Sequence, residues 1–520
     1  MQRPRGMSRI TSIFLVAGAL CATAVVTAGS EASATGPRTY AVDCGARVDG
    51  NGTFVRPFDS PADVNALVLA PGQQVLFRRG STCTGGLAPH GAGAPGRLIV
   101  IGAYGRGPQP RIVGTGADAI ALVNLSDVVL QDLDVSNPGV TPASRRGVHL
   151  VAAGTVERDV TVRRLSIHDV DGDLHKDSGG SGGIQLDASD VGGRFDRVVI
   201  AGNRIENVAR SGIFIAGAAS GSRPRAGEPW PEASTRVVVV GNRLEHLAGD
   251  GIVATGTDGA VLEHNVVVDG NRAGTPWNKP NPVCDAGIWT FGANSTLIQY
   301  NEVSFMEFNG CDGTGYDVDY NQDGTVVQNN YSHDNAGGFI LLCTDENPRA
   351  AEVRYNLSVD DAATLSDGPC DIQSGNVGSL DGLRFYNNTI VATKPAVTVE
   401  LLPEKPLFSP GDFVFANNIV VATAAQSDAF PCGDHCTNNL FFQMPPSGTN
   451  AVTADPRFAD GSRRGPGRLR EGLAFRLRSG SPAIRAGVIV SGSPERDYFG
   501  VEVPGGLPPS IGIDQHLTAS

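Results

Sequence analysis

An asparagine recurs through the middle of this chain, each time between two short runs rich in β-branched residues. VVIAGNRIENV (198–208) and VVVVGNRLEHL (237–247) show the unit: an alternating run, the asparagine and a second run. The spacing between marks varies from 23 residues, Asn242 to Asn265, to 39, Asn203 to Asn242. The marks are Asn203, Asn242, Asn265, Asn301, Asn330, Asn356, Asn388 and Asn418. Self-similarity at this period, with few helix-period segments, predicts a solenoid with one coil per unit.

The repeated asparagine has a physical role in such a stack. At an inward-turning corner its amide can hydrogen-bond the corner backbone and the asparagine one coil away, forming a ladder along the axis. A leucine-rich repeat is the rival solenoid, but its leucine pattern is missing, and a propeller would need Trp-Asp signatures at longer periods.

The asparagine-marked coils resemble the right-handed parallel β-helix of the pectate-lyase-like superfamily. The stretch from DPRFADG (455–461) to IGIDQ (511–515) is similar to the closing coils of secreted bacterial members. This resemblance implies an all-β, single-stranded right-handed parallel β-helix with an N-terminal cap and loop insertions. It implies a carbohydrate-active protein without fixing the reaction, because the superfamily contains glycoside hydrolases, polysaccharide lyases, epimerases and phage tailspikes.

The N-terminus has the pattern of an export signal. MQRPRGMSR supplies positive charge, IFLVAGALCATAVV is an apolar run, and Ala32-Ser33-Ala34 is an A-x-A cleavage site. A membrane anchor is the alternative, but the run is short for a span of about 20 residues. We therefore expect a secreted, extracellular and monomeric protein. The expected parts are a signal peptide (1–34), a cap with the first coils (35–125), a central helix with groove-forming loops (126–450), and closing coils with a tail (451–520).

Cysteine usage agrees with export. An even number of cysteines in an exported chain indicates disulfides. The eight cysteines outside the signal allow many pairings, which the sequence alone does not settle, and we expect nearest neighbours to pair. A zinc site is the alternative, but no spacing typical of one is present. The expected pairs are Cys44–Cys83, Cys284–Cys311, Cys343–Cys370 and Cys432–Cys436.

Composition narrows the partners. Acidic residues outnumber basic ones by 54 to 41, a formal charge of −13, which argues against nucleic acid or an anionic membrane as partner. Hydrophobic residues make up 41% of the chain, enough to fill a core.

The stretch GYDVDYNQDG (315–324) carries two carboxylates, Asp317 and Asp319, in a strand-like run. Residues two apart in a strand point to the same face. Aligning the third run of each coil on its glycine places the third and fifth residues outward. The aligned runs are GIQLD (183–187), GIFIA (212–216), GIVAT (251–255), GIWTF (287–291), GYDVD (315–319) and GFILL (338–342). The outward residues predicted in this way are Gln185, Asp187, Phe214, Ala216, Val253, Thr255, Trp289, Phe291, Asp317, Asp319, Ile340 and Leu342.

The alignment predicts a carbohydrate site. Trp289 and Phe291 should form an exposed aromatic pair one coil from Asp317 and Asp319, and a sugar ring can stack on an indole. Two strand steps separate the aspartate Cα atoms by about 6.6–6.8 Å, which suits one acid and one base of a glycosidase. This distance slightly favours an inverting mechanism over a retaining one. The alternative is an apolar surface patch beside solvated carboxylates.

Other polar residues could line the same groove. Asp285 and Asp312 precede their outward strands, as does Asp250, and His333 follows the pair at a corner. Lys279 lies in the loop before Trp289. Asp187 is four coils away and could form a distal sugar subsite.

Two further functions stay open at this point. A polysaccharide lyase or epimerase would use a Lys or Arg base, such as Lys279, and could use calcium. A non-catalytic glycan-binding or cell-surface protein would use the groove without chemistry.

Calcium also has a local candidate. Asp319, Asn321 and Asp323, followed by Gly324, fit the first half of a D-x-N-x-D-G calcium loop. The twelfth position is Asn330 and not Glu, and an ordinary turn explains Asp-Gly equally well. We expect no other cofactor.

Overall fold

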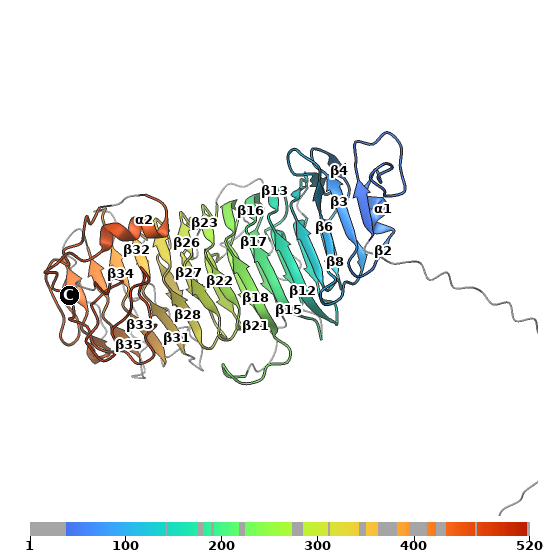
Figure 1. The fold of residues 1–520 in the computed structure, drawn as a ribbon. Helices are drawn as coiled ribbons and strands as arrows, with labels where there is room; N and C mark the ends of the chain where they lie inside the picture. The colour runs from blue at the N-terminus through green and yellow to red at the C-terminus, as the bar shows by residue number, and fades with distance from the viewer. Residues whose placement is uncertain are drawn as a thin grey trace, which may run out of the picture. The chain divides into compact units, whose positions relative to one another are not determined.

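The computed structural model describes residues 38–141, 143–174, 180–188, 192–217, 224–272, 284–309, 312–342, 350–361, 382–394, 413–422, 433–462 and 465–516. They all belong to one compact unit, residues 37–520. Within it the chain winds through successive coils that stack in sequence order (Figure 1). The expected signal peptide lies outside the described residues.

Three long sheets run along the stack, and every pair of neighbouring strands in its described part is parallel. The fifteen-stranded sheet contains β1 (Thr39–Val42), β3 (Gln74–Arg78), β6 (Ile99–Tyr104), β9 (Val128–Gln131), β12 (Val156–Arg163), β15 (Arg194–Ala201), β18 (Ser234–Val240), β21 (Thr257–Asp258), β22 (Val261–Glu263), β25 (Leu297–Gln299), β28 (Thr325–Gln328), β31 (Ala351–Arg354), β33 (Leu383–Tyr386), β35 (Val414–Ala416) and β37 (Cys436–Thr437). Along the asparagine-marked coils, the strand of this sheet that precedes each marked asparagine ends just before a corner.

The thirteen-stranded sheet follows that corner. It contains β4 (Thr82–Thr84), β7 (Arg111–Val113), β10 (Asp134–Asn137), β13 (Ser166–Val170), β16 (Arg204–Val208), β19 (Arg243–Leu247), β23 (Val266–Val268), β26 (Glu302–Ser304), β29 (Tyr331–His333), β32 (Leu357–Val359), β34 (Thr389–Val391), β36 (Ile419–Val421) and β38 (Leu440–Phe442). The eight-stranded sheet contains β8 (Asp118–Val123), β11 (Arg146–Val151), β14 (Gly182–Asp187), β17 (Ser211–Ala216), β20 (Ile252–Thr255), β24 (Ile288–Phe291), β27 (Tyr316–Val318) and β30 (Ile340–Leu342).

Short elements complete the described chain. A two-stranded sheet joins β2 (Val68–Leu69) and β5 (His90–Gly91) near helix α1 (Pro61–Asn65). Near the C-terminus lie η1 (Gly433–His435), α2 (Arg468–Gly472) and η2 (Leu473–Phe475). No helix in these ranges is long and apolar enough to cross a membrane.

The predicted asparagine ladder is confirmed. The side-chain amide of each marked asparagine donates to the side-chain oxygen of the next at 2.9–3.1 Å, from Asn203 to Asn418, and the ladder continues to Asn439. The same oxygen accepts the backbone N–H of the asparagine one coil earlier at 2.8–3.0 Å. Because these groups are buried, the ladder satisfies polar atoms at a corner that water does not reach.

The core explains why the coils stay in register. On the eight-stranded sheet Ile184, Ile213, Ile252, Ile288 and Tyr316 lie side by side in the core. A slip of one residue would turn every one of them outward.

The last aligned coil corrects the prediction by one residue. Ile340, and not Phe339, pairs with Tyr316, so that Leu341 faces outward. Ile340 and Leu342, predicted to be outward, belong to the core. The reason is an extra residue at the corner, because Phe339 stands where the preceding coil has Gly315 and packs edge-on against the Tyr316 ring.

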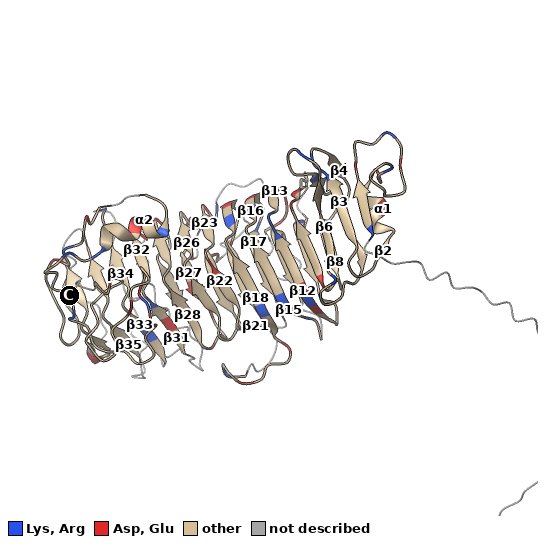
Figure 2. Cartoon of the chain, in the orientation of Figure 1, with Lys and Arg blue, Asp and Glu red and all other residues tan. Residues whose placement is uncertain are grey.

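Charged residues lie on the outer surface of the coils, in mixed rows. Blue and red segments lie close together on β12, β15 and β18 (Figure 2). Arg197 contacts Asp159 at 2.5 Å and Asp196 at 3.2 Å, and Arg236 contacts Asp196 at 2.5 Å. Such exposed pairs contribute little to stability, so these rows keep the surface soluble and do not hold the fold together.

The disulfide prediction is confirmed for Cys44–Cys83, whose sulfur atoms are 1.97 Å apart. Cys284 and Cys436 are also disulfide-bonded. The remaining predicted members, Cys311, Cys343, Cys370 and Cys432, lie outside the described residues.

The C-terminal segment packs against earlier coils. Phe475, Tyr498 and Ile513 share a hydrophobic cluster with Tyr331 and Leu357 of the thirteen-stranded sheet. The domain boundaries expected from the sequence stay predictions.

Candidate functional site

A single row of outward residues crosses the eight-stranded sheet, as predicted up to its last coil. Neighbours in this row are paired across successive strands, with Trp289 next to Asp317. The row consists of Gln185, Phe214, Val253, Trp289, Asp317 and Leu341. The aspartate therefore faces away from the core and lies one coil from the indole.

The prediction of an exposed aromatic pair is wrong. Trp289 is only 6% exposed and packs with Val253 and Ala286, while Phe291 is half-buried against the same cluster. Asp317 is only 4% exposed. A side chain on this sheet can therefore face outward and still be covered by neighbouring groups. Trp289 is covered in this way, one coil from the Asp317 carboxylate.

Asp319 is more accessible than Asp317. It follows β27 and is half-buried. Its backbone N–H donates to the Thr290 carbonyl of the preceding coil at 3.1 Å. Its Oδ1 accepts the N–H of Tyr320 at 2.6 Å. Asp312 has a similar half-buried environment and forms an isolated parallel bridge with Asp285 one coil earlier.

Asp285 and Asp250 belong to a buried ion cluster that sequence reasoning missed. The Arg210 guanidinium lies 3.0 Å from Asp250 Oδ2 and 2.7 Å from Asp285 Oδ1, and all three side chains are at most 2% exposed. Asp250 Oδ1 accepts the Trp289 indole N–H at 2.8 Å and the Ala286 N–H at 3.1 Å. The cluster therefore holds the N–H edge of the Trp289 indole.

The charge of this cluster follows from its geometry. Burial acts to lower the pKa of Arg210, but the Asp250 and Asp285 carboxylates outweigh it, so the pKa is raised. One feature of the sequence could have indicated this ion cluster. Arg210 stands just before Ser211-Gly212, and Asp250 stands just before Gly251 at the same corner of the next coil.

His333 lies on a different sheet from Asp317, and its predicted role at this site stays a prediction. It lies on β29 of the thirteen-stranded sheet, with Nδ1 2.8 Å from Asp334 and Nε2 3.4 Å from Glu302. Glu302 in turn accepts the N–H groups of Gly467 and Arg468 at 3.1 and 3.2 Å. His333 thus helps to anchor the C-terminal segment.

Two predicted substrate contacts lie at the margins. Asp187 ends β14 and is half-buried, four coils or about 19 Å from Asp319 along the sheet. Its role as a distal subsite stays a prediction. Lys279 lies outside the described residues.

The calcium interpretation of Asp319, Asn321 and Asp323 also stays a prediction. Asp323 Oδ2 accepts the N–H of Ala226 at 3.0 Å and lies 3.7 Å from the Arg225 guanidinium. That carboxylate is therefore already used to hold another segment of the chain.

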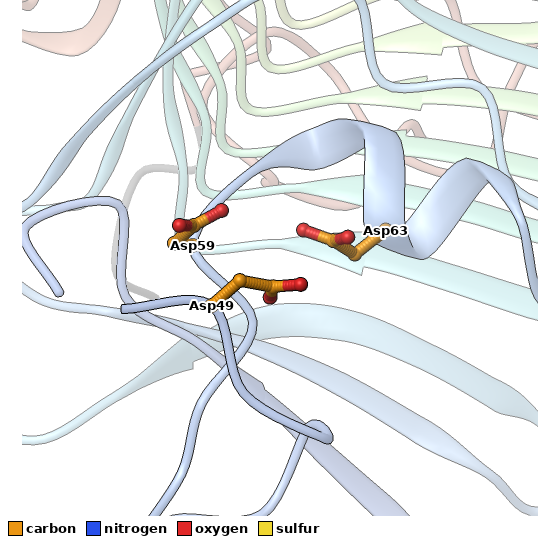
Figure 3. Close-up of side chains that lie close together, drawn as sticks. All are labelled: Asp49, Asp59 and Asp63. Carbon is orange, nitrogen blue, oxygen red and sulfur yellow. The ribbon is translucent and has the colours of Figure 1, made fainter. Parts of the chain in front are cut away.

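A different acidic group has the spacing of a cation site. Ligand oxygens of Asp49, Asp59 and Asp63 lie within 4.8 Å of one another beside α1 (Figure 3). Asp63 also accepts the N–H and hydroxyl of Ser60, at 3.1 and 2.6 Å. Hard cations such as calcium and magnesium prefer carboxylate oxygens of this kind.

A cleft of about 330 Å³ opens on the outer face of the thirteen-stranded sheet. Its walls carry acidic, basic, imidazole and amide groups, so the cleft is mainly polar. It is lined by His168, Asp169, Glu206, Asn207, His246 and Arg272.

Comparison with known proteins agrees with this architecture. The family described as "Right handed beta helix region" matches residues 182–390. A curated lacto-N-biosidase of Bifidobacterium longum subsp. longum is 28% identical over 69% of this chain. The match covers 26% of that relative, so this chain spans about a quarter of its length.

Solved structures give the same result. The crystal structure of a GH136 lacto-N-biosidase from Eubacterium ramulus is 25% identical, with a TM-score of 0.58 over 73% of this chain and 67% of that one. XylC in complex with xylose shares the fold alone, at 12% identity and a TM-score of 0.52 over 92% of this chain and 98% of that one. The chain therefore has the fold of a right-handed parallel β-helix.

Proposed function

We propose that this protein is a glycoside hydrolase that cleaves an oligosaccharide or polysaccharide on the outer face of its eight-stranded sheet. The observation that carries the proposal is its 28% identity to a curated lacto-N-biosidase. The carboxylates and the indole beside them on one sheet face support the same reaction class. The first substrates to test are oligosaccharides that carry lacto-N-biose, the disaccharide in the relatives' name.

We assign Asp317 and Asp319 as the catalytic pair. A glycosidase needs one carboxyl group to protonate the leaving oxygen and a second to activate water or attack the sugar. Burial disfavours the charged form of a carboxyl group, so the more buried Asp317 suits the acid. Half-buried Asp319 suits the base or nucleophile.

Trp289 supports this pair as a largely buried side chain next to Asp317, and not as an exposed surface on which a sugar ring stacks. Its N–H is used by Asp250, so only the apolar surface of the ring can face a sugar. Asp285 holds Arg210, which makes it a positioning residue.

The lyase alternative has less support. Arg210, which shares Asp250 with the Trp289 indole, lies between two carboxylates and cannot act readily as a base.

We further propose that the protein is exported and acts outside the cell as a monomer. The signal-like residues 1–34 and the Cys44–Cys83 disulfide support export, since disulfides persist in oxidising compartments.

A product assay tests the proposed reaction. Purified protein incubated with a glycan panel that includes lacto-N-biose-containing oligosaccharides should release new reducing ends. It should form none of the unsaturated products of a lyase. Unsaturated products would contradict hydrolysis, and glycan binding without cleavage would support the non-catalytic alternative.

A further inference from the structure

The insertion between β17 and β18 returns to the coils several layers away from where it leaves them. Its described part, residues 224–233, extends from the stack near β21 (Figure 1). It reaches Asp323, which precedes β28, and β28 is three strands from β18 in the fifteen-stranded sheet. Three strand spacings correspond to about 14 Å.

Two side chains of the coils hold this segment. Asn294 Nδ2 donates to the Pro224 carbonyl at 3.0 Å, and Asp323 Oδ2 accepts the Ala226 N–H at 3.0 Å. Asn294 and Asp323 are buried, whereas Pro224 and Ala226 are partly exposed, so the contacts are partly shielded from water. Arg225 adds charge attraction at 3.7 Å from Asp323.

The docked segment is also ordered within itself. The Arg225 N–H donates to Glu228 Oε2 and the Glu228 N–H to the Arg225 carbonyl, both at 3.0 Å. Gly324, at φ +73°, lets the segment approach, because a Cβ there would lie 3.1 Å from Ala226 Cβ.

The docking point lies at the end of the candidate site. Phe291 is three residues before Asn294, and Asp319 is four residues before Asp323, in the same two coils. Gly292 N–H donates to the Tyr320 carbonyl at 3.1 Å and ties these coils together at that corner. The segment therefore stands beside the edge of the sheet where Asp319 emerges.

We propose that residues 224–233 form a side wall of the site, and that Asp323 and Asn294 are positioning residues that hold it. The wall selects which oligosaccharides can lie along the outer face beside Asp319. This selectivity rests on the proposed function, whereas the docking itself does not. Asp323 therefore holds the wall in place, which gives the turn at Asp323 and Gly324 a role other than calcium binding.

Limited trypsin digestion of the full chain tests the docking. Cleavage after Arg225 requires the wall to leave the coil, since proteolysis acts on the locally opened state. Asp323→Ala removes the acceptor of the Ala226 N–H and should speed cleavage at Arg225 by roughly tenfold. Asp323→Asn keeps an acceptor oxygen and should restore most of the protection.

Selectivity is measured on the same variants, with kcat and KM for a short and a longer oligosaccharide. Asp323→Ala should change the ratio of the two kcat/KM values at least about fivefold through KM, with thermal stability and kcat nearly retained. Unchanged cleavage at Arg225 would overturn the docking. Faster cleavage with an unchanged ratio would overturn the role in selection. A wild-type protein that cleaves no glycan would instead contradict the proposed function, with the trypsin result still deciding the docking.

Discussion

At the scale of single residues, the buried Arg210 is the group whose partners matter most. It shares its charge between Asp250 and Asp285, in a site that water does not reach. Buried ion clusters contribute less to stability than their contacts suggest, but removing one partner leaves the other buried charges uncompensated. We therefore interpret the cluster as a device that fixes Trp289 beside Asp317.

Arg210→Met should lower the free energy of unfolding by about 3–5 kcal/mol, because two buried carboxylates lose their counterion. Chemical denaturation measures this change. The matched control is Arg243→Met, since Arg243 pairs with Glu245 at 2.5 Å on the surface and should cost about 1 kcal/mol or less. Equal costs for the two variants would contradict the role given to Arg210.

The candidate site could be predicted only in part from its residues. The period of the third runs placed Asp317 and Trp289 outward and adjacent, because side chains alternate along a strand. It could not show that both are enclosed, since alternation says which face a residue occupies and not what covers that face. Arg210 was missed because a lone arginine in a sequence reads as a surface residue.

At the scale of elements, the asparagine ladder and the glycine-started strands set the register. The ladder was predictable because a buried amide at a repeated corner needs a repeated partner. The slip at the last coil was not, since Phe339, and neither Gly337 nor Gly338, takes the position that Gly315 holds in the preceding coil. Packing decided it, by placing Phe339 against Tyr316.

Asn301→Ala should destabilise the helix by about 3 kcal/mol or more. Asn301 Oδ1 accepts both the backbone N–H and the side-chain amide of Asn265, and each buried donor left without an acceptor costs about 1–3 kcal/mol. Denaturant titration with far-ultraviolet circular dichroism gives the change. Asn51→Ala, at an exposed asparagine that caps a turn at Thr53, should remain within about 1 kcal/mol of wild type. A ladder variant as stable as that control would remove the structural role of the ladder.

At the scale of the whole molecule, stability should depend on pH through buried acids. Burial raises the pKa of Asp361 to about 6 against hydrogen bonds from Ser358 and Asn335 that act to lower it. Burial likewise raises the pKa of Asp497 to about 6. Both groups hold protons more tightly in the folded state, so the stability they contribute is lost as pH rises from about 4 to 6.

Other groups act outside this window. Burial opposes a charged His333, but Asp334 and Glu302 outweigh it and raise its pKa, so its contribution is lost above about pH 6.5. Glu302 has a lowered pKa despite its burial, because His333 and two backbone N–H groups favour its charged form. Its contribution is lost only as pH falls below about 4.5.

Asp361→Asn should therefore lose less stability than wild type between pH 4.5 and 6.5. The amide keeps an oxygen for the two hydrogen bonds from Asn335 and can donate to Ser358, but it does not titrate. Thermal melts across this range measure the slope. A variant whose melting temperature falls as steeply as that of wild type would show that Asp361 ionises freely in the folded protein.

The central claim is that carboxylates on the outer face of the eight-stranded sheet cleave a glycosidic bond. The most direct test measures the turnover of a cleaved glycan by Asp317→Asn and Asp319→Asn. Asp312→Asn shows whether that neighbouring carboxylate performs one of their roles, and Asp455→Asn, at an exposed position, is the control. We predict that the first two lose about 10²–10⁴-fold in kcat while their circular dichroism and melting temperature stay close to those of wild type. Full turnover in both variants would contradict the claim.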